Sequence, residues 1–373
     1  MLSITILLIL YYLFFYEKVW NKIILGASLP LSGINKELGQ EVYTGANAYF
    51  KYINEHGGIS GKKIVFIKYD DKYEPQNTIK NAKKLIIKDN VFALFDFVGT
   101  PTTKAILPFL DDTPLIAPYT GASIFRNRTN TNIINFRSSY REEIENIINY
   151  LYINKKIRRF AIFYQNDDYG ISGYNATVKT LQEHKLKLYG EGTYRRNTIS
   201  VDQALHEIGQ SNPEAIILVG AYKSTARFIK LWRERHSTKT LFAPISFVNA
   251  NALVNQLHKD AKGIYFSLTV PSYDDKNLDV ATEYRWIFSK YYPKSHLSYA
   301  SFESFLAAKA VVGALKKIHG SITRKKFIEQ LKNINPDIVG KLSISYKNTQ
   351  LLNQVYLSIF EDGKFLLINR TNK

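Results

Sequence analysis

The 373-residue chain contains no cysteine. This absence excludes disulfide bonds, thiolate metal ligands, a cysteine nucleophile and a lipid-modified N-terminal cysteine, but it leaves the redox compartment open. Closely spaced histidines are also missing, because the seven in the chain are scattered at positions 56, 184, 206, 236, 258, 296 and 319. Without clustered ligands we expect neither a metal site nor a cofactor.

Catalytic motifs are missing as well. The sequence contains no G-x-S-x-G, H-E-x-x-H or G-x-G-x-x-G pattern. The run 57–62 resembles a phosphate-binding loop only superficially, since its spacing is one residue short and Lys63 stands where that loop has serine or threonine. We interpret this run as a structural turn. With no nucleophile and base visible, the sequence predicts a protein that is not an enzyme.

Two aspartate pairs, Asp70-Asp71 and Asp167-Asp168, are the remaining candidates for acid–base chemistry. Each pair follows a predicted strand, where a carboxylate is equally suited to capping the next helix. We favour capping for Asp70-Asp71 and keep both roles open for Asp167-Asp168.

Acidic residues are in the minority, since 50 Lys and Arg stand against 32 Asp and Glu and give a formal charge of +18. The basic residues are dispersed in short clusters such as Lys83-Lys84, 155–159 and 324–326, which solvated helix faces explain. There is no recognition-helix pattern, zinc-finger spacing or low-complexity basic tail, so we predict no binding to nucleic acid. Attraction to anionic ligands or membrane surfaces remains open.

The N-terminal run from Leu2 to Tyr16 is apolar apart from Ser3 and Thr5. It is short for a spanning helix of about 20 residues, which favours the core of a signal peptide or a short membrane anchor. No Lys or Arg precedes the run and no small-x-small cleavage site follows it, so an uncleaved anchor and a buried first element stay as alternatives. We assign residues 1–22 to a signal peptide or anchor and expect the protein on the periplasmic or extracellular face of the inner membrane.

From Lys22 onward, short apolar runs alternate with segments of helical periodicity, a pattern typical of parallel sheets built from strand–helix–strand units. The predicted strands span 23–29, 63–69, 91–98, 114–117, 160–164, 186–194, 215–219, 241–245 and 263–269. The predicted helices span 39–56, 75–88, 101–110, 141–153, 170–184, 201–210, 222–235, 279–291, 300–318 and 324–332. These are too many strands for one compact sheet, and 132–140 looks like a passage between two similar halves. We therefore predict an α/β protein with two doubly wound parallel-sheet lobes.

The stretch 95–103 reads as a buried strand that runs directly into a helix. Thr100 suits the N-cap of that helix, and Pro101 suits its first helical position. Gly99 would let a ligand approach the backbone closely, and unpaired amides at a helix start favour an anion. This stretch is therefore a candidate site for a carboxylate or a phosphate.

Other loops at the carboxyl ends of predicted strands are also candidates, because open α/β sheets bind ligands at that edge. In the first half these are the small, turn-rich loops 28–33 and 118–123. In the second half, 165–170, 220–222 and 246–249 offer hydroxyls, amides and aromatic rings, which suit the wall of a small-molecule pocket.

The ordered set of motifs resembles the type I periplasmic binding proteins, specifically the branched-chain amino acid-binding (leucine-binding) group that serves ABC importers. The resemblance covers nearly the whole chain from about residue 22, and it depends on the order and spacing of its pieces. These pieces are 26–33 (GASLPLSG), 53–62 (INEHGGISGK), 69–71 (YDD) with 73–75 (YEP), 99–102 (GTPT), 120–122 (TGA) and 163–170 (FYQNDDYG).

This resemblance implies a Venus-flytrap protein whose two lobes are joined by three crossovers and close on a small ligand by hinge motion. It implies lobe 1 at 23–138 plus 268–349, and lobe 2 at 139–267 plus 350–373. In similar proteins the loops matching Gly99-Thr100 and 119–122 hold the ligand carboxylate, while Tyr169 and Tyr222 give aromatic contacts from the second lobe. The implied ligand-binding residues are Gly99, Thr100, Thr102, Tyr119, Thr120, Gly121, Ala122, Asp168, Tyr169, Tyr222 and Ser246.

Two departures from that group bear on the ligand. Its members carry an acidic residue that pairs with the ligand ammonium, whereas the corresponding stretch here, 246–248, has none. The aromatic residue that lies over the ligand from the first lobe corresponds to Leu38 here. Either Asp167 or Asp168 supplies the counter-charge, or the ligand is a carboxylate without an amine.

We predict a monomeric, non-enzymatic protein that captures a small carboxylate ligand, such as an amino acid or a related acid or amide, and presents it to an ABC permease in the membrane. The alternative from another class is a membrane-anchored ligand-sensing module that reports to a signalling partner. A third alternative, an amidase regulator or an enzyme on the same scaffold, has less support because no nucleophile–base pair is visible.

Overall fold

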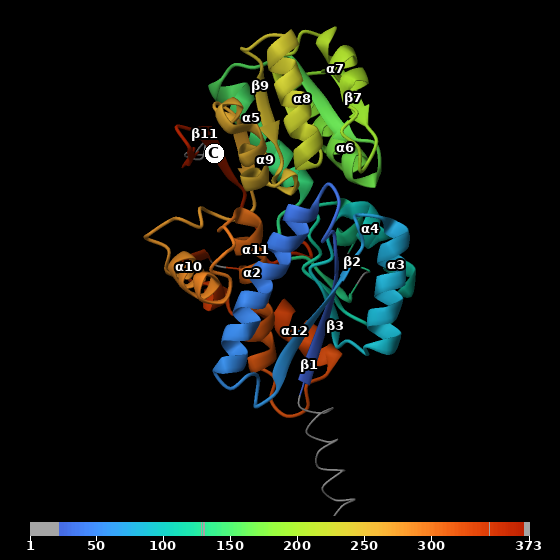
Figure 1. Ribbon diagram of the computed structural model, residues 1–373, viewed down its shortest axis with the longest axis vertical. Coiled ribbons are helices and arrows are strands. Elements are labelled where there is room, and N and C mark those ends of the chain that lie inside the picture. Colours follow the sequence, from blue (N-terminus) through green and yellow to red (C-terminus); the bar gives the residue numbers. More distant parts are fainter. Residues whose placement is uncertain (1–21, 128, 130, 343, 369–373) are drawn as a thin grey trace, which may run out of the picture.

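The computed structural model describes residues 22–127, 129, 131–342 and 344–368. The predicted signal peptide or anchor lies outside the described residues, except that Lys22 is the first residue of a strand. Figure 1 shows two lobes, one above the other, and the chain passes between them three times. This confirms the predicted two-lobed α/β fold. The boundaries given above for the two lobes stay a prediction.

Lobe 1 is built on a parallel sheet in the order β2-β1-β3-β4-β5. Its strands are β1 (Lys22–Leu29), β2 (Lys63–Asp70), β3 (Ala93–Phe95), β4 (Leu115–Ile116) and β5 (Ile133–Ile134). The strand predicted for 91–98 is shorter than expected, because Asp96 adopts a left-handed φ of 57° and ends the extended run. Beyond it, Val98 makes only an isolated bridge to Tyr119.

The helices of lobe 1 cover both faces of this sheet (Figure 1). They are α2 (Lys36–Glu55), α3 (Pro75–Lys83) with the π-helical turn η1 (Lys84–Lys88), α4 (Thr100–Lys104), η2 (Leu107–Phe109), η3 (Ser123–Arg126), α10 (Asp279–Tyr291), α11 (Tyr299–Lys316), α12 (Arg324–Lys332) and η6 (Pro336–Leu342). α2 and α11 pack so closely that a Cβ on Gly45 would lie 2.0 Å from the Ser301 carbonyl oxygen. The late helices α10 to α12 thus join the lobe in which the chain begins.

Lobe 2 contains the parallel sheet β7-β6-β8-β9 and an antiparallel sheet β10-β11-β12. Its strands are β6 (Phe160–Gln165), β7 (Leu188–Tyr194), β8 (Ala215–Val219), β9 (Leu241–Pro244), β10 (Tyr265–Leu268), β11 (Tyr356–Glu361) and β12 (Lys364–Leu367). Its helices are α5 (Tyr140–Asn154), α6 (Asp168–Glu183), α7 (Asp202–Gly209), α8 (Tyr222–Arg235), η4 (Ser246–Val248), α9 (Ala250–Leu257) and η5 (His258–Ala261). α9, β5 and the β11–β12 hairpin were not predicted from the sequence.

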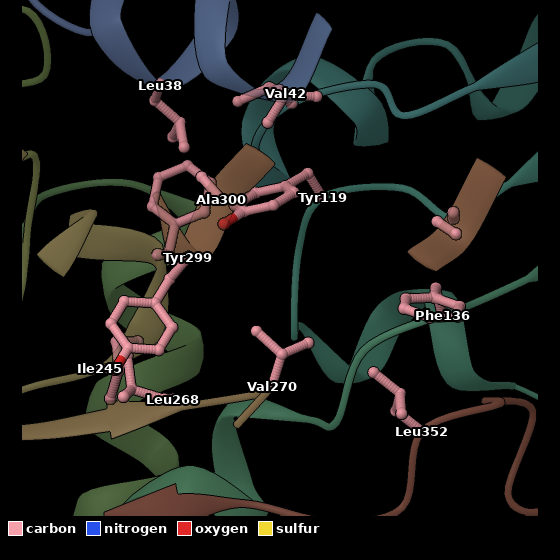
Figure 2. Packing of buried hydrophobic residues seen from close by; sticks show 14 of the residues in the cluster. Leu38, Val42, Tyr119, Phe136, Ile245, Leu268, Val270, Tyr299, Ala300 and Leu352 are labelled. Carbon is pink, nitrogen blue, oxygen red and sulfur yellow. The ribbon is translucent and has the colours of Figure 1, made fainter. Parts of the chain in front are cut away.

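Three crossovers connect the lobes: β5 to α5, β10 to α10, and η6 to β11. Two of them run side by side, since Asn135 N–H donates to Thr349 O and Leu352 N–H donates to Phe136 O. Phe136, Val270 and Leu352, one from each crossover, are buried in the same apolar cluster (Figure 2). The hinge region is therefore packed as tightly as a core.

Candidate ligand-binding site

Five buried rings meet where the two lobes face each other. Phe247 of η4 is central: its ring centroid lies 4.5 Å from that of Tyr169, 6.2 Å from those of Tyr73 and Tyr119, and 6.5 Å from that of Tyr140. None of the five side chains is more than 3% exposed. We call these five residues the aromatic cluster. They follow the carboxyl ends of strands in both lobes, which is the edge where open α/β sheets place their ligands.

The loop after β3 approaches this cluster through Gly99. Its φ of 98° is a conformation that favours glycine, and a Cβ there would lie 2.3 Å from Tyr73 Cε2. Gly99 is also the N-cap of α4, so the prediction that Thr100 caps this helix is wrong. Thr100 is the first helical residue and Pro101 the second, because the chain turns into the helix at the glycine. α4 is only five residues long, which leaves little macrodipole to hold an anion.

Threonine hydroxyls from two loops meet beside the cluster. Thr100 Oγ1 and Thr120 Oγ1 are hydrogen-bonded at 2.8 Å, and Ala122 N–H donates to Thr120 Oγ1 at 3.2 Å. Thr102 is different, because its hydroxyl donates back to Val98 O and Gly99 O, just before its own helix begins. Of the predicted carboxylate residues, the structure therefore brings Thr100, Thr120 and Ala122 together and ties the Thr102 side chain to the backbone.

The loop 119–122 is fixed against the start of α5. Tyr140 N–H donates to Gly121 O at 2.9 Å, and a Cβ on Gly121 would lie 2.6 Å from Tyr140 N. Burial raises the pKa of Tyr140, while Arg137 and the hydroxyl of Thr120 lower it in part. The Tyr140 phenol is thus held next to the threonine pair in its protonated form, able to donate a hydrogen bond.

Asp167 and Asp168, adjacent in sequence, do different things. Asp167 caps α6 by accepting from Tyr169 N–H at 3.0 Å and Gly170 N–H at 3.5 Å. Its carboxylate also accepts from Gln165 Nε2 and Arg196. Asp168 is about half exposed and pairs with Lys104 Nζ at 2.6 Å, which links lobe 2 to lobe 1 at the surface. The structure therefore does not place Asp168 among the rings of the aromatic cluster.

Asp70 and Asp71 do not cap the next helix, which corrects the prediction made for them. Glu74 is the N-cap of α3, and its side chain makes no capping hydrogen bond. Asp71 is buried instead, and accepts from the Tyr73 N–H and from the hydroxyls of Ser28 and Thr78. Asp71 thereby fixes the backbone at Tyr73, one of the five rings.

Tyr222 and Ser246 also lie at the lobe-2 side of the junction. Tyr222 is 1% exposed, and its hydroxyl has no hydrogen-bond partner among the described residues. Tyr169 donates its hydroxyl to Gly220 O at 3.4 Å, in the loop just before Tyr222. The predicted residues Tyr169 and Tyr222 are therefore both buried at this edge of lobe 2.

Ser246 belongs to a buried ionic network that the sequence analysis missed. Arg137 Nη2 donates to Ser246 Oγ at 2.6 Å and to Glu303 Oε2 at 3.1 Å. Ser246 in turn donates its Oγ and its N–H to the Glu143 carboxylate at 2.9 and 2.7 Å. We call Arg137, Glu143, Ser246 and Glu303 the hinge network. It joins a crossover, α5, η4 and α11.

The hinge network lies directly behind the aromatic cluster, because the Arg137 guanidinium carbon is 4.1 Å from the centroid of the Tyr119 ring. Burial raises the pKa values of Glu143 and Glu303, and the guanidinium of Arg137 opposes that shift. A carboxylate therefore does stand next to Ser246, but Glu143 supplies it and its oxygens are occupied by Ser246. Neither Asp167 nor Asp168 fills that position.

Polar contacts fasten the lobes to each other around the cluster. Glu74 of lobe 1 accepts from Arg196 Nη2 at 3.1 Å and from Asn197 Nδ2 at 2.6 Å. On another side, Glu41 of α2 accepts from Asn249 Nδ2 at 3.0 Å. Burial raises the pKa of Glu41 to about 7. Together with the Lys104–Asp168 pair, these contacts hold the lobes closed over the rings.

Within the part of the chain that the structure describes, no group of three or more His, Asp or Glu side chains is placed to hold a metal ion. No helix among the same residues is both long and apolar enough to cross a membrane. The polar and aromatic groups at the junction are of the kinds that line small-molecule sites in proteins.

Comparisons with known proteins agree with this arrangement. A possible leucine/isoleucine/valine-binding protein from Rhodopirellula baltica has a TM-score of 0.87 and 29% identity, with 94% of this chain and 96% of that chain covered. A substrate-binding periplasmic protein from Ralstonia solanacearum has a TM-score of 0.87 and 25% identity, covering 93% of this chain and all of that one. An amino acid binding protein from Pseudomonas aeruginosa is 23% identical over 224 residues.

The match to the Pseudomonas protein spans 58% of each chain, so the chain covers little more than half the length of that relative. The family whose pattern matches, "periplasmic binding protein", spans residues 22–364. It is a family of solute-binding proteins and not of enzymes, as the sequence analysis predicted. The match over residues 22–364 accounts for the two parallel-sheet lobes: the chain belongs to the periplasmic binding protein family.

Proposed function

We propose that this protein captures a small carboxylate ligand between its lobes, outside the cytoplasmic membrane, and delivers it to an ABC importer. The main support for this proposal is that the hydrogen-bonded hydroxyls of Thr100 and Thr120 lie next to the aromatic cluster at the junction. When one hydroxyl of a bonded pair donates to the other, the second keeps a free proton. That proton and the Tyr140 phenol point to an acceptor such as a carboxylate.

The charges around the site favour a ligand without an ammonium group. A buried ammonium needs a carboxylate partner. Glu143 is occupied by Ser246, Asp167 by the start of α6 and by Arg196, and Asp168 by Lys104. Of the two alternatives that the sequence leaves, these contacts favour the carboxylate that lacks an amine. The five rings of the aromatic cluster favour a ligand that is apolar or aromatic apart from its carboxylate.

A matched pair of ligands tests this specificity. Leucine and its 2-oxo acid, 4-methyl-2-oxopentanoate, share carbon skeleton and carboxylate and differ in the ammonium group. We expect the oxo acid, or an aromatic acid in the same thermal-shift series, to raise the melting temperature more than leucine does, since a ligand at about 100 times its Kd adds about 2.7 kcal/mol. A larger shift with leucine would contradict the proposal that the ligand lacks an ammonium group. No shift with any acid would contradict the proposed carboxylate site.

Capture by closure is supported by the contacts that span the lobes, notably Arg196 with Glu74 and Lys104 with Asp168. Periplasmic binding proteins that close around a ligand do so by hinge motion. Small-angle scattering with and without the best ligand of the thermal-shift series should show a smaller radius of gyration in the bound protein. Uptake of that ligand by vesicles that contain the importer, dependent on this protein, would test delivery; uptake unchanged without it would contradict delivery.

A further inference from the structure

The end of lobe 1 that is remote from the junction carries a basic face. β1 and β2 begin there side by side, with Lys22 opposite Lys63 in the parallel register. The turn between α11 and α12 lies at the same end, next to the start of β1 (Figure 1). Arg324 fixes that turn to the sheet by donating to Val91 O and Phe92 O, just before β3 begins. We call six residues at this end the basic pole: Lys22, Lys63, Lys316, Lys317, Lys325 and Lys326.

All six lysines of the basic pole are exposed, and none belongs to an ion pair among the described residues. No acidic residue occurs between Glu303 and Glu329, a stretch that contains four of the six. Nearby carboxylates are fewer than the lysines. Asp112 pairs with Arg324 at 2.6 Å and Glu55 pairs with Lys290 at 2.7 Å, which leaves Asp89, Asp111 and Glu329 against the six charges. The face therefore carries a net positive charge that the described carboxylates do not balance.

The position of the basic pole in the fold indicates what faces it. Residues 1–21, which include the apolar run from Leu2 to Tyr16, join lobe 1 at Lys22, inside this face. The ligand-binding edge lies at the opposite ends of the same parallel strands. A broad, flat partner can therefore cover the basic pole without obstructing the junction.

We propose that the basic pole binds the surface of a lipid bilayer that contains anionic phospholipid, so that lobe 1, while the protein is not docked on the importer, contacts the membrane through the end remote from the junction. Lysine clusters are attracted to anionic headgroups, and that attraction adds to whatever the apolar run contributes. The proposal holds whether the apolar run is retained or removed, because the six lysines belong to the folded lobe. It does not depend on the identity of the ligand.

Vesicle co-sedimentation of the full chain tests this proposal. The two probes are vesicles of phosphatidylcholine alone and vesicles with about one third phosphatidylglycerol. We expect the anionic lipid to increase binding at least tenfold at low salt, and about 0.5 M salt to remove that increase, since the attraction is screened. Equal binding to both vesicles would show that the apolar run acts alone and would overturn the proposal, and so would binding to neither.

Matched variants separate the basic pole from the overall charge of +18. The pole variant carries Lys316→Gln, Lys317→Gln, Lys325→Gln and Lys326→Gln. The control variant carries four exposed lobe-2 changes: Lys179→Gln, Lys187→Gln, Lys239→Gln and Lys259→Gln. We expect the pole variant to lose the preference for phosphatidylglycerol and the control to keep it. Equal losses would overturn the proposal, because they would assign the attraction to net charge and not to one face.

A label reports the orientation directly, and the absence of native cysteine makes it specific. Ser321→Cys at the pole and Thr238→Cys on lobe 2 are both at exposed positions and accept an environment-sensitive fluorophore. We expect the label at position 321, and not the one at 238, to shift its emission when phosphatidylglycerol vesicles are added. The same shift at both positions, or at 238 alone, would overturn the proposed orientation. This readout does not require any lysine to be replaced, so it also covers the case of a pole variant that fails to fold.

Discussion

The lobe-1 side of the junction and the hinge network behind it are built in different ways. On the lobe-1 side, short loops after parallel strands present small residues, such as Gly99, Thr100 and Thr120, whose contacts are made within or between neighbouring loops. In the hinge network, Arg137 reaches Glu303, which is 166 positions away in the sequence, and Ser246, which is 109 positions away. One side depends on local chain geometry and the other on charges brought together by the whole fold.

This difference separates ligand recognition from the energetics of the hinge. The threonine hydroxyls on the lobe-1 side make few contacts, and removing one should change ligand affinity more than stability. A buried charge network responds differently, because removing one member leaves the others without a partner in a low-dielectric interior. The predictions below test that separation, beginning with the network.

Arg137→Met should produce the largest effect on stability. The substitution keeps much of the side-chain volume but leaves the buried carboxylates of Glu143 and Glu303 without their cation. We expect a loss of about 3–5 kcal/mol in the free energy of unfolding, measured by urea denaturation. Arg141→Met is the matched control, because Arg141 pairs with Glu145 and Glu183 at the surface and should contribute less than about 1 kcal/mol. Similar losses in the two variants would contradict the assignment of the hinge network as a stability element.

Glu41 should make stability depend on pH, because it lies partly buried between the lobes with Asn249 and Ser298 as partners. Burial raises its pKa from 4.5 to about 7. The folded state therefore holds a proton that the unfolded chain has already lost, so stability falls as pH rises from about 4.5 to about 7. The loss is on the order of 3 kcal/mol.

Glu41→Gln keeps an oxygen acceptor for Asn249 and Ser298 but removes the titration. Urea unfolding between pH 5 and 8 should therefore show a weaker decline in the variant than in the parent chain. Buried Asp71, whose pKa burial raises to about 6, titrates in both proteins, and its contribution cancels in the difference. Glu145→Gln, at a surface position, is the control. Parallel pH profiles of the parent chain and Glu41→Gln would show that Glu41 does not titrate in this range.

The two-lobed fold was predictable because alternation of apolar runs and helical periodicity is a local signal. The helices at 222–235, 279–291 and 324–332 were predicted with the bounds that the structure has. The hairpin β11–β12 was missed, although Asp362-Gly363 between apolar runs is a recognisable turn signal. α9 was missed because it is only eight residues long and follows β9 through the short turn η4.

At the candidate site, the strand-end loops were predictable from the sequence, and the contacts between them were not. Thr100, Thr120 and Tyr169, which the structure places at the junction, were named as candidates because each follows a predicted strand. Arg137 was not, since its partners come from α5, η4 and α11, and no spacing in the sequence brings these together. The signal available was a lone arginine at the end of the mainly apolar run 133–137 (IINFR), in a segment predicted to pass between the lobes. Such a cation must find a partner when it is buried.

Gly99→Ala tests the lobe-1 side through the backbone. Alanine at a φ of 98° is strained, and its Cβ would lie 2.3 Å from the Tyr73 ring. Gly61→Ala is the control, because Gly61 also has a positive φ of 78° but a Cβ there would meet nothing within 4 Å. Both variants should lose about 1 kcal/mol from backbone strain, and Gly99→Ala about 1–2 kcal/mol more from the clash. Equal melting temperatures of Gly99→Ala and Gly61→Ala would show that the Tyr73 ring moves aside freely. In that case the contacts of Asp71 do not fix the ring.

Thr100→Val should have the smallest effect on the fold and a clear one on the ligand. Valine keeps the shape of threonine and removes the hydroxyl that bonds Thr120 at 2.8 Å. If the pair presents its free proton to a carboxylate, affinity should fall by about tenfold, the value of one hydrogen bond to a charged group. Thr177→Val is the matched control, because that buried hydroxyl donates to Gly173 O within α6. Calorimetric titration of both variants with the best acid of the thermal-shift series separates the roles, since a structural hydroxyl would lower stability in either variant without changing affinity. Unchanged affinity in Thr100→Val would remove Thr100 from the site and leave carboxylate binding to the backbone of 119–122.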